Sequence, residues 1–236
     1  MWTLYDELIE QAADDIVAEV QQGDSWTMVK TKKGHLGIAA TAPSRTGKKA
    51  DPAMFEGMSV REAAGLMKSW DFEKATVGVA ALNAVINDPD KQPVCENPDA
   101  FLRYKDKCMG KKVAVIGHFQ YLENRLQGLC DLYVLERRPG AEDYPDPACE
   151  YLLPEMDVVF ITGCALTNKT MPRLLELSRN AFTIVSGPST VMSEVMLRHG
   201  ADALCGFCVT DEAACRDTVS DCAGVFQSGR MVCIEK

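Results

Sequence analysis

Small and polar residues follow the apolar runs in the second half of the sequence, where they could bind a ligand. One such stretch is "FITGCALTNKT", residues 160–170, which begins like a buried strand. It then presents Cys164, Asn168, Lys169 and Thr170 before the next expected helix, which has Pro172 in its first turn. Because free N–H groups at a helix start attract anions, an exposed Lys169 predicts an anionic ligand. The alternative is an ordinary helix capped by Asn168 or Thr170.

A second polar turn occurs in "SGPST", residues 186–190. Its turn residues are Gly187, Pro188, Ser189 and Thr190. The earlier apolar run at residues 157–163 likewise ends in small and polar residues, Thr162 and Gly163. Glycine and proline suit a tight turn, and the hydroxyl groups can bind a polar ligand. Two such turns at the ends of expected strands favour a binding site over isolated helix caps.

Three potential metal ligands follow three different expected strands: His118, Glu136 and Cys164. Imidazole, carboxylate and thiolate together suit zinc or a softer metal. The alternative is a packed histidine, a salt-bridged glutamate and a buried thiol. These side chains are compatible with a transition or heavy-metal ion as a cofactor, but they do not decide between the two alternatives.

Gly117 and Glu136 stand 19 residues apart. This spacing is similar to dinucleotide-binding folds, where an acid about 20 residues on holds a ribose. The turn "GHFQYL" has a single glycine, however, so a pyrophosphate could not approach it closely. Ordinary NAD binding is disfavoured, while a different nucleotide-like ligand stays open, with Arg137 at the same strand end.

Five apolar runs with helical or long connections between them predict a parallel sheet. They cover residues 112–119, 131–137, 157–163, 182–187 and 201–207. Continuous apolar runs are typical of parallel strands covered on both faces, and the alternation predicts a Rossmann-like, doubly wound α/β fold. Ligands of such sheets bind beyond the carboxyl ends of the strands, which is where the polar residues above lie.

The first half predicts a smaller α+β arrangement. Apolar residues recur every four positions from Leu4 to Val20, which predicts one long helix. "KKG" at residues 32–34 predicts a hairpin turn, and "SVRE" at residues 59–62 predicts a capping box. The run around "VGVAALNAVIN" is apolar nearly all round, which predicts a buried helix. Its Asn83 must find backbone partners or face a cleft between the halves.

The stretch "NDPDKQPVCENPDAF", residues 87–101, separates the two halves. It contains three prolines among acids and amides, which is typical of a linker. We therefore expect a first domain over residues 1–90 and a second over residues 91–236.

The 236 residues carry a formal net charge of −9, which argues against nucleic-acid and anionic-membrane partners. No apolar run approaches the roughly 18 residues of a membrane-spanning helix, and the acidic, amphipathic start does not resemble a secretory signal. We therefore expect a cytoplasmic protein. Association with further copies of the same chain, as a homo-oligomer, stays open.

Ten cysteines are a high count, and in a cytoplasmic protein they are expected to be reduced thiols. The C-terminal ones, Cys205, Cys208, Cys215 and Cys222, contain one CxxC and no second close pair. Structural zinc sites usually use two such pairs. Because Cys205 and Cys208 are expected on opposite faces of a strand, core packing is favoured over a zinc site.

Six motifs in a fixed order carry a resemblance to a known family. They are "GIAAT", "VGVAALNAV", "VIGHF", "VLERRPG", "ITGCALTNKT" and "SGPST". Together they resemble the family described as putative heavy-metal chelation, over nearly the whole chain. The resemblance implies an enolase-N-terminal-like α+β domain, then a Rossmann-like domain, with a site in the cleft between them. No barrel follows the first domain, so enolase chemistry is not implied.

The resemblance implies that the cleft binds a small anionic or metal-chelating ligand in a metal-homeostasis role. By this match the site comprises Asn83, Gly117, His118, Glu136, Arg137, Thr162, Gly163, Asn168, Lys169, Gly187, Pro188 and Ser189, and the polar turn adds Thr170. The rival is an enzyme acting on a nucleotide-like or carboxylated small molecule in the same cleft. Lys169 or His118 would then transfer a proton while Glu136 holds the ligand.

Overall fold

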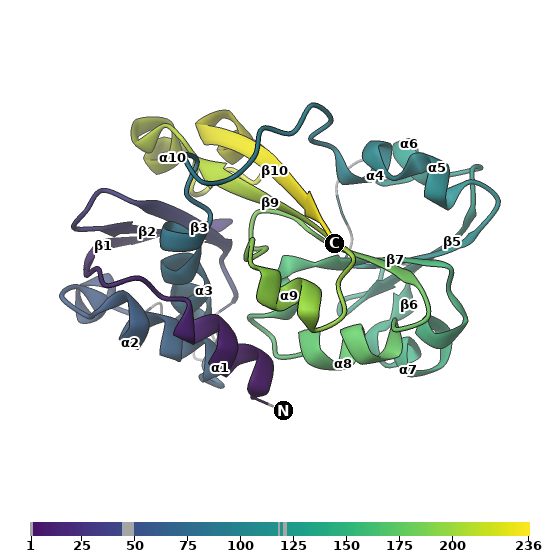
Figure 1. Ribbon diagram of the computed structural model, residues 1–236, viewed down its shortest axis with the longest axis horizontal. Helices are drawn as coiled ribbons and strands as arrows, with labels where there is room; N and C mark the ends of the chain where they lie inside the picture. The colour runs from purple at the N-terminus through teal and green to yellow at the C-terminus, as the bar shows by residue number, and fades with distance from the viewer. Residues whose placement is uncertain (1, 44–49, 118, 120–121) are drawn as a thin grey trace.

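Two β-sheets of different size organise the chain into two units (Figure 1). The computed structural model describes residues 2–43, 50–117, 119 and 122–236. The small-sheet unit holds the described residues before 87, and the large-sheet unit holds those from 100 onward. The small sheet is antiparallel and the large one mostly parallel with helices on both faces, which confirms the predicted mixed α/β fold.

The small sheet has the order β1-β2-β3. Its strands are β1 (Val17–Gln22), β2 (Trp26–Thr31) and β3 (Leu36–Ala40), preceded by α1 (Thr3–Glu10). β2 and β3 form the predicted hairpin, and Gly34 in its turn has a φ of 91°. The long helix predicted over residues 4–20 is wrong, because α1 ends early. A bulge between Val17 and Glu19 lets Val17 and Val20 enter one core, so their spacing imitates a helix.

Helices cover one side of the small sheet (Figure 1). After α1 come η1 (Pro52–Phe55), α2 (Val60–Gly65), η2 (Leu66–Lys68) and α3 (Phe72–Ile86). The predicted capping box is confirmed: the Ser59 hydroxyl accepts from the Glu62 N–H, and the Ser59 N–H donates to the Glu62 carboxylate. α3 is buried on nearly every side, as predicted. It can touch the sheet because a Cβ at Gly37 would clash with the backbone of Ala84.

The large sheet has the order β10-β9-β8-β7-β4-β5-β6. Its strands are β4 (Lys112–Ile116), β5 (Asp131–Glu136), β6 (Tyr144–Pro145), β7 (Val158–Thr162), β8 (Phe182–Ser186), β9 (Ala203–Val209) and β10 (Gly229–Glu235). All five predicted strands are present, whereas β6 and the antiparallel β10 were not predicted. Numbered from β4, the parallel strands have the order 3-2-1-4-5-6 of a doubly wound sheet.

Short helices cover both faces of the large sheet (Figure 1). α4 (Ala100–Arg103), α5 (Lys105–Cys108) and α6 (Leu122–Leu126) lie on one face, and α7 (Cys149–Leu152), α8 (Met171–Leu177) and α9 (Glu194–Arg198) lie on the other. The strand residues alternate accordingly: Phe160 belongs to the core under the first set, and Val159 and Ile161 to the core under the second. Within the described ranges, no helix is long and apolar enough to cross a membrane.

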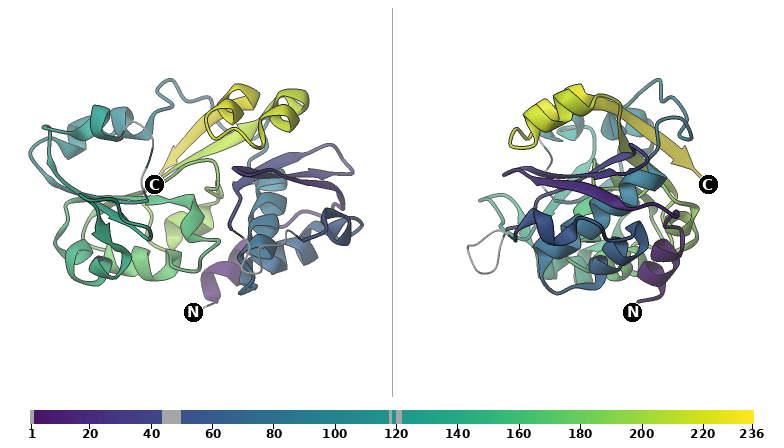
Figure 2. Two further views of the ribbon diagram at one scale, coloured as in Figure 1. Left: turned by 180° about the vertical axis from the view of Figure 1, so that it is seen from behind. Right: turned by 90° about the vertical axis from the view of Figure 1, so that its left-hand side faces the viewer.

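The two units share apolar cores. Leu4 and Leu82 of the small-sheet unit belong to the same cluster as Val159 and Ile161. A second cluster joins Met28 to residues of β9 and of α10 (Glu212–Thr218). Seen from behind, the two units lie next to each other (Figure 2). The pair therefore packs as one body rather than as two domains on a tether.

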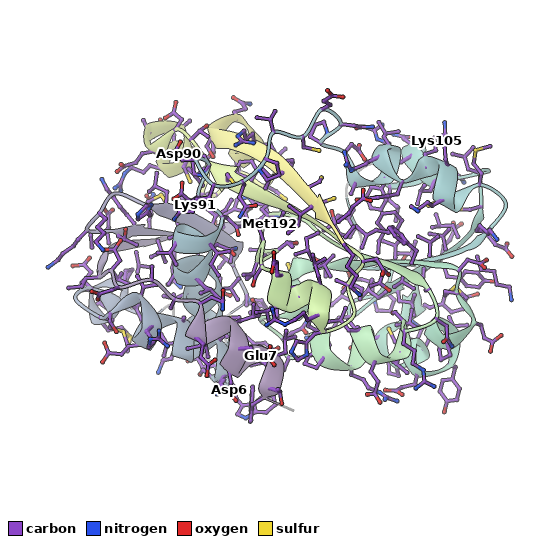
Figure 3. The ribbon with its side chains drawn as sticks, in the orientation of Figure 1. Asp6, Glu7, Asp90, Lys91, Lys105 and Met192 are labelled. Atoms are coloured by element: carbon purple, nitrogen blue, oxygen red, sulfur yellow. The ribbon has the colours of Figure 1, made fainter. Side chains whose placement is uncertain are left out.

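A buried amide links the units through hydrogen bonds. Asn87 follows α3 and is 1% exposed. Its Nδ2 donates to the carbonyls of Thr190 (2.8 Å) and Phe207 (3.2 Å), and its Oδ1 accepts from the N–H of Met192 (3.0 Å). Met192 lies between the two units (Figure 3). Each of these backbone groups would be costly to bury without a partner.

Ion pairs surround this interface. They join Glu7 to Arg198, Lys30 to Glu212, and Glu19 to Arg216, and the His199 Nε2 lies 3.0 Å from the Glu7 carboxylate. Glu7 lies on α1, where that helix approaches the large-sheet unit (Figure 3). Because exposed ion pairs typically contribute 1 kcal/mol or less, the buried bonds of Asn87 and the shared cores carry the contact.

Residues 87–99, between α3 and α4, have no helix or strand. The division of the chain into residues 1–90 and 91–236 stays a prediction. We expect limited proteolysis to cut first within residues 88–111, and the two fragments to co-elute in size-exclusion chromatography because the interface holds them together. Rapid cutting within residues 112–210 while 88–111 stays intact would contradict the two-domain division.

Replacing Asn87 tests the interface directly. We expect Asn87→Ala to lower the free energy of unfolding by about 2–4 kcal/mol, because it leaves buried carbonyl and N–H groups without partners. Urea denaturation measures this change. Asn180→Ala is the control, since Asn180 is exposed in the turn before β8 and its loss should cost less than about 0.5 kcal/mol. Equal effects from both variants would show that the amide bonds do not hold the interface.

Candidate functional site

A cavity of about 300 Å³ lies at the carboxyl ends of β4, β5 and β7. Among the described residues its lining is Ile116, Gly117, Phe119, Leu135, Glu136, Arg137, Asp146, Thr162, Cys164, Ala165, Asn168 and Thr170. The strand order reverses between β4 and β7, so the cavity occupies the place where doubly wound sheets bind ligands. All of these residues belong to the large-sheet unit, whereas the sequence predicted a cleft between the two halves.

Gly117 shapes the cavity where β4 ends. Its φ of 95° lies in the left-handed region, which other residues adopt at a cost. A Cβ at this position would lie 3.0 Å from the Thr162 methyl group. The Thr162 hydroxyl in turn accepts from the N–H of Cys164 (3.3 Å), which begins the turn after β7. The glycine therefore lets the ends of β4 and β7 approach closely along one wall of the cavity.

Charges of both signs line the cavity at the end of β5. The Glu136 Oε1 accepts from the N–H groups of Arg137 (2.6 Å) and Arg138 (3.2 Å), which fixes the carboxylate at the strand end. The Arg137 Nη2 lies 3.4 Å from the Asp146 carboxylate. The cavity can therefore offer a guanidinium to a ligand's anionic group and a carboxylate to a hydroxyl group or a cation.

Asn168 and Thr170 form an uncharged part of the cavity wall. The Asn168 Oδ1 accepts from both the N–H (3.0 Å) and the hydroxyl (2.6 Å) of Thr170. Thr170 is the residue before α8, yet its side chain makes no capping bond. The expectation that Asn168 or Thr170 caps the helix is therefore wrong: Asn168 orders the turn before the helix. Pro172 lies in the first turn, as predicted.

Asn83 lies in the interface between the units and not among the residues that line the cavity. It is 1% exposed, and its Nδ2 donates to the carbonyls of Ile38 (2.9 Å) and Pro188 (3.4 Å). The predicted backbone partners are therefore present. Its Oδ1 has no hydrogen-bond partner among the described residues.

The turn "SGPST" also packs into the interface. Ser189 is 2% exposed, and its hydroxyl accepts from the N–H of Ala40 at the end of β3 (2.8 Å). Its Oγ lies 3.7 Å from the Cys164 Sγ, next to the cavity. A Cβ at Gly163 would clash with the backbone of this turn, and Gly187 has a φ of 104°. Ligand contact by Gly163, Gly187, Pro188 and Ser189 stays a prediction.

Lys169 is partly buried, so the exposed position expected for it is wrong. Its Nζ donates to the carbonyl of Thr167 (2.7 Å) and lies 5.1 Å from the centre of the Phe72 ring. Burial lowers the pKa of this amine to about 8, although nearby Asp71 opposes the shift. Lys169 therefore faces the small-sheet unit and is not among the residues that line the cavity.

The structure shows the positions of two of the three predicted metal ligands. Glu136 and Cys164 both line the cavity, whereas His118 lies outside the described residues. Over the described ranges, no three histidine, cysteine, aspartate or glutamate side chains are arranged to hold a metal ion. A centre made of His118, Glu136 and Cys164 stays a prediction, and the described residues do not by themselves fit a protein-bound metal.

Asp146 and Phe119 line the cavity but were missed from the sequence. Asp146 follows β6, which has two residues and so gives no strand pattern to place it. Phe119 looked like part of the β4 run, and its ring also lies 5.3 Å from that of Phe101 in the core. The only available signal for Asp146 was its position within the turn-rich stretch between two expected strands.

The fold and the cavity define a two-unit α/β protein with a cavity at the switch point of its large sheet. The chain belongs to the family described as putative heavy-metal chelation, whose two models match residues 5–86 and 99–235. The resemblance predicted from the six motifs is therefore confirmed.

Three relatives resemble the chain to different degrees. A protein of unknown function from Desulfitobacterium hafniense is 36% identical, with a TM-score of 0.93 over 100% of this chain and 99% of that one. One from Pyrococcus horikoshii is 22% identical, with a TM-score of 0.81 over 99% and 98%, and shows the fold alone. An uncharacterised protein from Methanocaldococcus jannaschii is 34% identical over 145 residues, 56% of this chain and 52% of the relative. The chain thus spans about half the length of that relative.

The buried amine of Lys169 predicts a pH-dependent penalty on stability. A lysine whose pKa falls on folding destabilises the protein below that pKa, and the penalty disappears as the pH rises from about 8 towards the ordinary lysine range. Lys169→Met should therefore raise the free energy of unfolding at pH 7 by roughly 1 kcal/mol, and this gain should shrink by about pH 10. Urea unfolding of both proteins at the two pH values measures the difference.

Lys105→Met is the matched control, because Lys105 is exposed on α5 (Figure 3). It should change stability little at either pH. A loss of stability in Lys169→Met at pH 7 would mean that the contacts with Phe72 and Thr167 outweigh the cost of burial.

Proposed function

We propose that this protein binds a small carboxylated molecule, alone or as its metal chelate, in the cavity at the ends of β4, β5 and β7. One observation carries the proposal: Arg137, Glu136 and Cys164 line the same cavity of about 300 Å³. A guanidinium recognises a carboxylate through paired N–H groups, and a carboxylate and a thiol can complete the coordination of a metal that the ligand already holds.

The size and the setting of the cavity support a small polar ligand. Its volume is at the lower end of the range of small-molecule pockets. Apolar side chains such as Ile116, Leu135 and Phe119 supply part of the wall, and Thr162, Asn168 and Thr170 supply hydroxyl and amide groups. Such a mixture favours a ligand with a short carbon skeleton and several polar substituents.

The family description supports the metal part of this proposal. Because the described residues do not form a metal centre of their own, the ligand would bring most of the metal's donor atoms. Glu136 is held in place by two backbone N–H groups, so its carboxylate is pre-positioned. Cys164 would contribute a soft donor once its thiol has lost a proton. We therefore propose that the protein handles a chelated metal as part of metal homeostasis.

Binding of citrate and of nickel citrate tests the proposal. Arg137→Gln should weaken the binding of both ligands by about 1.5–3 kcal/mol, the usual contribution of a hydrogen bond to a charged group. Glu136→Gln should weaken nickel citrate more than citrate, because it removes the charge that favours the cation. Isothermal titration calorimetry measures all four changes.

Arg179→Gln provides the control, since Arg179 is exposed beyond α8 and does not line the cavity. It should leave both affinities unchanged. If neither ligand binds the wild-type protein, or if Arg137→Gln and Arg179→Gln behave alike, the proposed pocket is not a carboxylate site.

A second candidate is an enzyme acting on a nucleotide-like molecule in the same cavity. It is favoured by Glu136, which ends the second strand of a 3-2-1-4-5-6 sheet, where dinucleotide-binding folds keep the acid that holds a ribose. Native mass spectrometry of the purified protein separates the two candidates. A retained nucleoside-containing ligand favours the enzyme, and a retained carboxylic acid or metal chelate favours the binding protein.

A further inference from the structure

A group of thiols lies far from the cavity, on the face of the large sheet that packs under α4 and α5. Cys205 on β9 is fully buried and Cys233 on β10 is 8% exposed. The two residues are directly opposite each other in the antiparallel pair, and their sulfur atoms lie 3.0 Å apart. Both are free thiols in this structure. This separation is close enough for a bond to form with little movement of the backbone.

The strand register favours such a bond. The N–H of Lys236 donates to the carbonyl of Asp202, and the N–H of Thr210 donates to that of Ser228, so the hydrogen-bonded pairs along β9 and β10 are fixed. Counting along the register, Cys205 and Cys233 form a non-hydrogen-bonded pair. In such pairs the Cα atoms are about 4.5 Å apart, within the range of disulfide bonds.

A third thiol gives access to this pair. Cys95, in the segment between α3 and α4, is partly exposed. Its thiol donates to the carbonyl of Asn97 (3.0 Å) and interacts electrostatically with the thiol of Cys233. Its Sγ also lies 3.5 Å from the Arg103 Nη1. Burial raises the pKa of Cys95, while the Arg103 guanidinium opposes that rise by stabilising the thiolate. Cys95 is thus the member of the group that a small oxidant reaches first.

We propose that Cys95, Cys205 and Cys233 form a thiol–disulfide exchange site that ends in a disulfide between Cys205 and Cys233. A low-molecular-weight disulfide is the oxidant. The Cys95 thiolate attacks it, forming a mixed disulfide and releasing one small thiol. Cys233 displaces the second small thiol to give Cys95–Cys233, and Cys205 then attacks Cys233 and returns Cys95 to its thiol form. The protein loses two protons and two electrons, which reduce the oxidant to two thiols.

Cys208 and Cys222 lack this arrangement. Cys208 lies on the same strand but faces the core on the opposite side of the sheet. Cys222 is exposed, so it can form a mixed disulfide, but no cysteine is placed opposite it in a strand pair. The exchange site is therefore specific to one face of β9 and β10, and its bond would attach the last strand of the chain to the sheet.

Oxidised glutathione added to the full-length protein tests the proposal. Intact-mass measurement should show the loss of two hydrogens, and peptide mapping should place the bond between Cys205 and Cys233. Because the bond closes a long loop, the melting temperature should rise by roughly 5–10 °C. Cys233→Ser and Cys205→Ala should each abolish the bond, and Cys95→Ser should slow its formation at least about fivefold.

Cys208→Ala is the matched control, since this thiol is equally buried on the same strand and its loss should leave the bond unaffected. Formation of mixed disulfides alone, or of a bond between other cysteines, would overturn the proposal. So would an equal rate of bond formation in Cys95→Ser and the wild type. A zinc or copper ion that co-purifies with the protein and is lost in Cys233→Ser would also overturn it, because the thiols would then be metal ligands.

Discussion

The need to satisfy buried backbone groups where the two units meet constrains the rest of the structure. Turns after β7 and β8 enter the interface and would bury carbonyl and N–H groups without solvent. Asn83 and Asn87, one helical turn apart on and after α3, provide amides that pair with these groups on both sides. The Asn87 amide suits this position because it both donates and accepts, whereas the Asn83 amide only donates among the described residues. The helix that appeared only as a buried apolar run is thus the element that fixes the large-sheet unit.

This interface decides which polar residues remain available to a ligand. The hydroxyl of Ser189 is used by the N–H of Ala40, and the amine of Lys169 is directed to Thr167 and Phe72. Both residues therefore support the contact between the units, although each follows a strand end where ligands bind. The groups that line the cavity come from β4, β5 and β7 instead. Cys164 lies at the boundary, since it lines the cavity and also approaches Ser189. Cys164 alone would therefore separate a ligand in the cavity from Ser189 in the interface.

The large sheet carries thiols in two chemically different environments. At its carboxyl edge, Cys164 lines a cavity together with carboxylate and guanidinium groups. On one face of β9 and β10, Cys205 and Cys233 lie in an apolar core and make contact with each other. The strand register places these two thiols directly opposite each other.

The sequence alone determined the alternation of strands and helices, the hairpin, the capping box and the edge of the sheet that carries Gly117, Glu136 and Thr162. These follow from local patterns, because apolar runs, turn residues and caps act over a few neighbouring positions. It could not determine that β1 is a strand, since a bulge gave its valines a helical spacing. Nor could it show the pairing of Cys205 with Cys233, or the burial of Lys169, because both depend on segments far apart in the chain. Only the tertiary structure decided which polar residues face the cavity and which hold the units together.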